Sequence, residues 1–205
     1  MWRLLSLSLL ACTTGCIGAP FVTPPARVSV TYLSLSKPLP RGGTNAAHFE
    51  VGVHPAALLS RAHDRQLDAG IGYGFVASKG GFVHAPYLEI QALPLIYALG
   101  KTTLVRAGTA MKPLLLFGRA EEGAGFGGTA QILIELSDYT SGTFSNSSSD
   151  GGVIGFGAGE LGIGLHLEAS AMQLNGTSIW GAGVGVNVRL PASMGFAWVF
   201  VPPGK

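Results

Sequence analysis

From Ala26 onward, apolar residues alternate with glycine or polar residues, and short glycine-rich or Ser/Asn-rich breaks separate the alternating runs. A period of two puts the apolar side chains on one face of an extended strand and the remaining side chains on the other. Helical periodicity is nearly absent; the one exception, residues 55–66, we interpret as a connection. The pattern therefore predicts an all-β fold, an antiparallel up-and-down β-barrel of about eight strands, possibly eight to ten.

This barrel domain is expected to span residues 26–205, with the segment 138–152 as its longest loop. The expected strands comprise six clear runs and three weaker ones. They are residues 67–76, 86–97, 103–117, 126–137, 153–169 and 179–190, with weaker runs at 27–36, 48–54 and 194–201.

The low charge of the chain indicates whether the outer surface of this barrel faces water or lipid. Charged residues make up 12% of the sequence, about half the usual share of roughly 25%. A soluble barrel would expose a face that is mostly glycine, whereas an outer-membrane barrel turns its apolar set to lipid and its polar set into the lumen. The composition favours the membrane barrel, and the scattered basic residues exclude a nucleic-acid-binding stripe.

The first sixteen residues, MWRLLSLSLLACTTGC, combine one positive charge, a short apolar run and small residues before a cysteine. This arrangement is typical of a signal peptide, and the apolar run is too short to span a membrane as a helix. The segment resembles bacterial lipoprotein precursors, in which the cysteine that ends the lipobox is acylated and becomes the first residue. The resemblance implies a signal peptide at 1–15, lipidation at Cys16 (alternatively Cys12), and a lipidated N-terminus and tether at 16–25.

Most charged residues of the strands fall on the face opposite the apolar set. In a membrane barrel this face lines the lumen, where acids and bases can pair. The predicted lumen network consists of Asp68, Glu89, Arg106, Lys112, Glu135, Glu160, His166, Glu168 and Arg189.

Two groups of residues are candidate sites of chemistry. His166, Glu168 and Ser170 share one strand face, and a Ser/His/acid set is the minimum for nucleophilic catalysis; it bears a faint resemblance to outer-membrane barrels that remodel lipid A. His48, Glu50 and His54 could bind a metal. Both groups are more simply explained as polar lumen residues, so we expect no catalytic residue, no metal and no cofactor.

The sequence therefore favours a non-enzymatic, lipid-anchored outer-membrane β-barrel of a Gram-negative envelope, with a structural or adhesive role. Its expected partner is membrane lipid, nucleic acid is not expected, and protein partners stay open. One alternative is a lipocalin-like binder whose apolar interior is lined by Leu161, Ile163, Leu165 and Val186. Another is a lipid A-modifying enzyme that uses His166 and Ser170.

Overall fold

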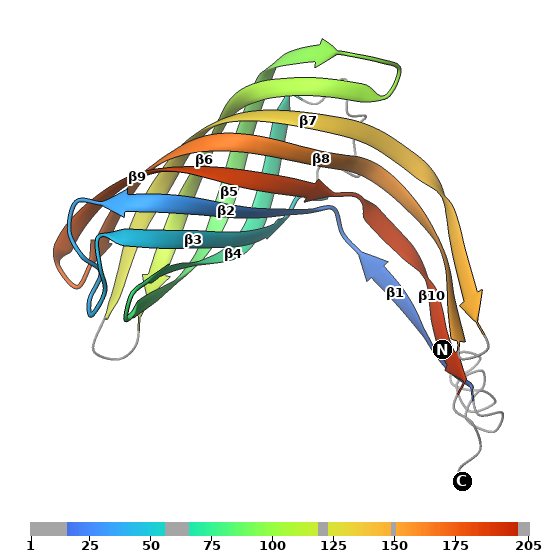
Figure 1. Ribbon diagram of the computed structural model, residues 1–205, viewed down its shortest axis with the longest axis horizontal. Helices are drawn as coiled ribbons and strands as arrows, with labels where there is room; N and C mark the ends of the chain where they lie inside the picture. Colours follow the sequence, from blue (N-terminus) through green and yellow to red (C-terminus); the bar gives the residue numbers. More distant parts are fainter. Residues whose placement is uncertain (1–15, 56–65, 119–122, 149–150, 201–205) are drawn as a thin grey trace, which may run out of the picture.

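The computed structural model describes residues 16–55, 66–118, 123–148 and 151–200 of the chain. This part of the chain consists almost entirely of antiparallel strands (Figure 1). They are β1 (Cys16–Thr23), β2 (Ala26–Leu35), β3 (Asn45–Val53), β4 (Leu67–Ser78), β5 (Gly81–Ala98), β6 (Thr103–Phe117), β7 (Ala124–Ser148), β8 (Gly151–Leu174), β9 (Thr177–Leu190) and β10 (Ala192–Phe200). Among the described residues, no helix has the length and apolar character needed to cross a membrane.

Strands β2 to β9 form a closed eight-stranded barrel, which confirms the predicted fold class. Each strand pairs with the next one in the chain, and β9 pairs with both β8 and β2 to close the ring. The described residues form ten strands, because β1 and β10 lie outside this ring. The segment 56–65, which was expected to be a connection, lies outside the described residues.

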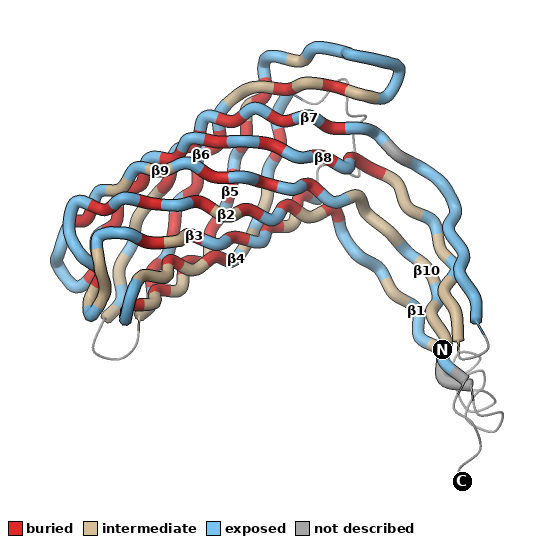
Figure 2. The backbone as a smooth tube through the Cα atoms, viewed as in Figure 1, coloured by how far each residue is buried: buried red, intermediate tan, exposed pale blue. Residues whose placement is uncertain are grey.

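Burial follows the sequence alternation in every barrel strand, as the alternating buried and exposed residues in Figure 2 show. Apolar side chains such as Ile132, Leu165 and Val186 are exposed on the outer face. Polar side chains such as Gln131, His166 and Asn187 are buried in the interior. The inside-out distribution predicted for a membrane barrel is therefore present.

One end of the barrel interior is apolar. It lies beside the β4–β5 hairpin and the β8–β9 hairpin, where the strand ends contribute mainly hydrophobic side chains. The cluster contains Leu33, Leu35, Leu39, Ala46, Val76, Val83, Ala85, Tyr87, Leu114, Leu116, Met172, Leu174 and Ile179.

The β8–β9 hairpin at this end has a two-residue turn. Asn175 and Gly176 both adopt positive φ, 46° and 77°, and this combination is the type I′ geometry that an Asn-Gly pair adopts readily. The turn fixes the register in which Leu174 pairs with Thr177. Paired residues of β8 and β9 therefore project to the same face of the sheet from the turn onward.

At the other end, four strands continue beyond the barrel as a sheet that we call the flap. It consists of residues 141–148 of β7, residues 151–158 of β8, β10 and β1, in the order β7–β8–β10–β1. In Figure 1 these strands bend away from the barrel and carry both described chain ends to their tip.

The flap corrects two expectations. The predicted loop 138–152 is mostly strand, because residues 141–148 pair continuously with residues 151–158. The predicted tether also differs, since residues 16–23 form β1 and pair along their whole length with β10. Pro24 and Pro25, whose nitrogens cannot donate to a ladder, separate β1 from β2.

The junction between barrel and flap is a bulge in β8. Gly162 pairs with Arg189 and Ala158 with Ala192, so β8 has one residue more than its partner across this step. Gly159 lies in the bulge at a φ of 137°, where a residue with Cβ is strained. The bulge allows β8 to exchange β9 for β10 as its neighbour while its pairing with β7 stays in register.

Candidate functional site

The candidate site is the packed polar interior of the barrel. Every Lys, Arg, Asp and Glu residue of β2 to β9 is buried there except Asp138, which lies where β7 leaves the barrel. The ten buried residues are Arg27, Glu50, Asp68, Glu89, Arg106, Lys112, Glu135, Glu160, Glu168 and Arg189. All nine residues predicted for the lumen lie in this interior, each between 0% and 4% exposed.

The first group of contacts surrounds two arginines near the flap end. Arg106 donates to Glu135 Oε1 from Nη2 at 2.6 Å and to Glu160 Oε1 from Nη1 at 3.0 Å. Arg189 donates from Nε to Glu135 Oε1 and from Nη1 to Asp68 Oδ2, both at 3.0 Å. The two guanidinium groups and three carboxylates therefore form one continuous network.

The second group joins Arg27 to Glu89 by an ion pair. Gln91 Nε2 also donates to Glu89 Oε1 at 2.6 Å. His54 lies between two carboxylates, with its Nε2 at 3.4 Å from Glu89 Oε2 and its Nδ1 at 3.3 Å from Asp68 Oδ2. His54 therefore links the second group to the first.

The third group is centred on Glu50 and Glu168. Lys112 Nζ donates to Glu50 Oε2 at 2.5 Å, and Ser29 Oγ donates to the same oxygen at 2.5 Å. His48 donates from Nδ1 to Glu168 Oε1 at 2.8 Å, while its Nε2 faces Glu50 Oε1 at 3.6 Å. This histidine, like His54, lies between two carboxylates.

A metal site was considered for His48, Glu50 and His54, but the structure separates them, since His54 belongs to the second group. Ligand atoms of His48, Glu50 and Glu168 do lie within 4.8 Å of one another. However, the Lys112 ammonium already provides the cation beside Glu50. A further cation would have to bind next to this positive charge, so the group is an ion-pair cluster.

The proposed nucleophilic set is also buried, and its members do not form the required contacts. His166 Nε2 lies 2.7 Å from Thr31 Oγ1. Thr31 in turn donates to Glu168 Oε2 at 3.0 Å. Ser170 Oγ has no hydrogen-bond partner, so the contact between nucleophile and base that the chemistry needs is not made.

The buried charges of the barrel interior balance only if His48 and His54 are counted as cations. The interior holds four Arg or Lys side chains and six Asp or Glu side chains, an excess of two negative charges among the described barrel strands. His48 and His54 each lie between two of these carboxylates. Protonation of both would make the interior electrically neutral.

On the side of the third group that faces away from the flap, the interior becomes apolar. Lys112 Nζ lies 5.2 Å from the centre of the Tyr87 ring, which contributes to the apolar cluster at that end. The Tyr87 ring covers Gly72, where an added Cβ would meet its Cζ at 2.3 Å. The described interior thus holds salt bridges toward the flap end, together with a small apolar cluster of Leu93, Ala110 and Leu133, and hydrophobic side chains at the other end.

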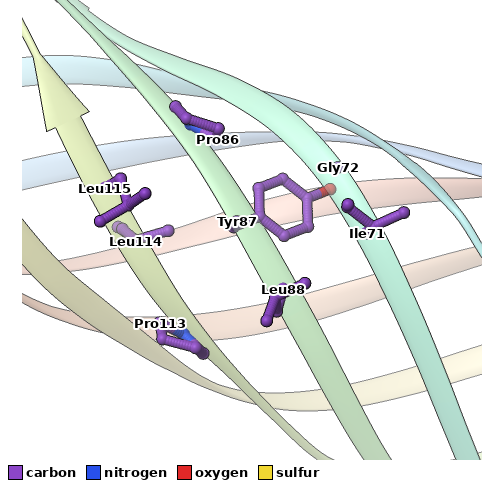
Figure 3. A pocket seen from close by; sticks show the side chains of 8 residues that line it. All are labelled: Ile71, Gly72, Pro86, Tyr87, Leu88, Pro113, Leu114 and Leu115. Atoms are coloured by element: carbon purple, nitrogen blue, oxygen red, sulfur yellow. The ribbon is translucent and has the colours of Figure 1, made fainter.

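The outer wall has an apolar groove of about 410 Å³ where β5 and β6 meet (Figure 3). Pro86 and Pro113 line it, and neither can donate a backbone hydrogen bond to the ladder. Tyr87 and Leu114 close its floor from the barrel interior. The groove belongs to the apolar outer surface and does not reach the charged network.

Several residues of the network were not in the predicted set. Arg27 and Glu50 lie on two strands with weak alternation. Gln91, Gln131 and Asn187 are uncharged amides, whereas the predicted set contained only charged residues and histidine. Gln91, Gln131 and Asn187 have the same strand parity as the predicted lumen residues on their strands. Arg27 and Glu50 alternate with the apolar residues of β2 and β3, so parity was the signal that could have identified all five.

No protein-family model matches the chain, and no curated protein matches it.

Proposed function

We propose that this chain is a lipid-anchored β-barrel of the Gram-negative outer membrane, with a closed interior and a structural or adhesive, non-enzymatic role. A single observation carries the proposal. Ten of the eleven Lys, Arg, Asp and Glu residues of β2 to β9 are buried in the interior, Asp138 being the exception, while large apolar side chains are exposed on each of the eight strands. Water does not favour such an outer surface, whereas the hydrocarbon core of a bilayer does.

The filled interior supports a role other than transport. Apolar residues occlude one end, and paired arginines and carboxylates occupy the remainder together with a small apolar cluster of Leu93, Ala110 and Leu133. The exposed positions of Leu161, Ile163, Leu165 and Val186 correct the expected lining of an apolar-ligand pocket, because all four lie on the outer face. A structural or adhesive barrel therefore fits the interior better than a ligand carrier.

The test of this proposal is refolding into phosphatidylcholine vesicles. We expect the chain to co-float with the vesicles, to resist extraction at alkaline pH, and to migrate differently on a gel before and after boiling. In planar bilayers it should produce no conductance steps, because the interior is packed. A chain that stays soluble without detergent, or one that forms regular channels, would contradict the proposal.

The anchoring is tested separately at Cys16, the first residue of β1. After expression in a Gram-negative host, mass spectrometry should find a diacylglyceryl group on an N-terminal Cys16 peptide, because two or more acyl chains give stable attachment. Cys16→Ala should abolish the modification, whereas Cys12→Ala should leave it. Modification at Cys12 alone, or an unmodified N-terminus beyond residue 16, would show that the anchor is assigned wrongly.

A further inference from the structure

His48 joins two strands that are not neighbours in the barrel. Its Nδ1 lies 2.8 Å from Glu168 Oε1, and its Nε2 lies 3.6 Å from Glu50 Oε1. His48 and Glu50 belong to β3 and Glu168 to β8, and β2 and β9 lie between these two strands in the ring. The contact between His48 and Glu168 therefore crosses the lumen, where no backbone ladder holds β3 to β8.

Glu168 depends on a histidine for a positive charge. Its side chain is fully buried, and it accepts hydrogen bonds from Thr31, Gln131 and His48. Among the described residues, no Arg or Lys forms a salt bridge with it, and its ionic contacts are with His48 and His166. Because a buried carboxylate without a cation is costly, we expect one of these two histidines to carry a second ring proton.

The hydrogen bonds of Thr31 indicate that this histidine is not His166. Thr31 has a single hydroxyl proton, which it donates to Glu168 Oε2 at 3.0 Å. It must then accept a hydrogen bond from His166 Nε2, which lies 2.7 Å from its oxygen. Among the described residues, His166 Nδ1 has no hydrogen-bond partner, so a second proton there would be buried and unsatisfied. His166 is therefore the neutral Nε2–H tautomer, and the positive charge falls to His48.

The other charged groups around His48 agree with one additional proton. Lys112 of β6 would repel a cation, but its Nζ donates to Glu50 Oε2 at 2.5 Å. Lys112, Glu50 and Glu168 together carry one net negative charge, which a proton on His48 cancels. His48 Nε2 faces Glu50 Oε1, and neither atom has a hydrogen-bond partner among the described residues.

The remaining neighbours of this cluster are uncharged at neutral pH. They are Ser29 and Thr31 of β2, Gly74 of β4, Tyr87 of β5 and Gln131 of β7.

We propose that His48 is protonated in the folded barrel and acts as a pH-sensitive clamp, whose imidazolium holds β3 to β8 and whose deprotonation at alkaline pH releases them. Without this proton, Glu50 and Glu168 have only Lys112 between them, and the contact across the lumen loses its ionic attraction. The inference goes beyond the proposed function. It concerns the interior alone, so it holds whether the outer wall faces lipid or water.

Proton linkage gives the direction of the effect on stability. A histidine in the unfolded chain loses its second ring proton near about pH 6.5, whereas the clamped His48 keeps it to higher pH. The folded state then binds more protons than the unfolded state. The stability that His48 contributes is therefore fully present below about pH 6.5 and falls as the pH rises. For one retained proton, the equilibrium constant of unfolding increases up to about tenfold per pH unit.

The direct test is NMR of the histidine ring nitrogens in the full chain, labelled at histidine and refolded in detergent micelles. At about pH 7.5, one unit above the ordinary histidine value, we expect both nitrogens of His48 to be protonated and His166 to have one protonated nitrogen. Glu168→Gln should let His48 release its proton at lower pH. Replacing the five histidines one at a time assigns the signals, by elimination if His48→Gln does not refold. A singly protonated His48 at this pH overturns the inference.

Urea unfolding at several pH values tests the clamp through stability. Between about pH 7 and 8, the unfolding constant of His48→Gln should rise less steeply than that of the unmodified chain, by up to about tenfold per pH unit. All other titrating groups are unchanged, so the difference in slope reports His48. The matched control is His166→Gln, which should leave the slope unchanged because a neutral histidine holds no extra proton. An unchanged slope in His48→Gln, or a reduced slope in His166→Gln alone, would contradict the clamp.

Discussion

Replacing Lys112 with methionine is expected to destabilise the refolded barrel by about 3–5 kcal/mol, because it leaves a buried carboxylate without its cation. Lys112 donates to Glu50, and Glu50 lies close to Glu168 through their shared partner His48. Without the ammonium, these two carboxylates remain in an interior where charge is poorly solvated. Urea titration in detergent micelles, followed by tryptophan fluorescence, measures the change.

The double variant Lys112→Met with Glu50→Gln tests whether pairing is the cause. Removing both members of a buried ion pair is often nearly neutral, so most of the lost stability should return. Lys101→Met is the matched control at an exposed lysine of the β5–β6 turn, where a surface change should stay within about 0.5 kcal/mol. Glu50→Gln is also measured alone. If the losses of stability in Lys112→Met and Glu50→Gln simply add in the double variant, Lys112 and Glu50 are not coupled.

Period-two alternation was sufficient to predict the barrel and the face on which each charge of the six clear strands lies. Glu89, Glu135 and Glu168 all have a parity opposite to the apolar set of their strands, and all three are buried in the interior. Parity is a local property, and a barrel with one apolar face fixes it strongly because a one-residue slip would expose every lumen residue to the outside.

Pairing partners within the interior could not be read from the sequence. Arg106 contacts Glu160, which is 54 residues away on a strand that is not its neighbour. Such contacts depend on the stagger and tilt of the strands around the ring, which alternation does not specify. For the same reason, His48 and His54 appeared to form one set but belong to different groups.

The flap was missed because composition indicated a loop. Residues 138–152 are rich in serine, asparagine and glycine, which usually mark turns. Their strand conformation depends on a partner: residues 141–148 pair only with residues 151–158 of β8, which are held on the other side by β10. The signal that was available was the alternation in residues 153–158 and 194–199, both of which extend beyond the length that the barrel needs.

The outer surface can be tested with one substitution at two depths. Leu167 lies near the middle of the part of β8 that belongs to the barrel and Leu161 at its flap end, and both are more than half exposed. If this surface faces lipid, Leu167→Arg should cost about 2–4 kcal/mol and Leu161→Arg about 0–1 kcal/mol, because the penalty for arginine falls from the bilayer midplane to the interface.

If the surface faced water, arginine at both positions would change the free energy of unfolding by less than about 0.5 kcal/mol. Urea unfolding of both variants in phosphatidylcholine vesicles, beside Leu167→Ala and Leu161→Ala as controls for the lost side chain, separates the two cases. A penalty that depends on depth for arginine but not for alanine can come only from the solvent around the barrel, and equal tolerance at Leu167 and Leu161 would rule out a bilayer.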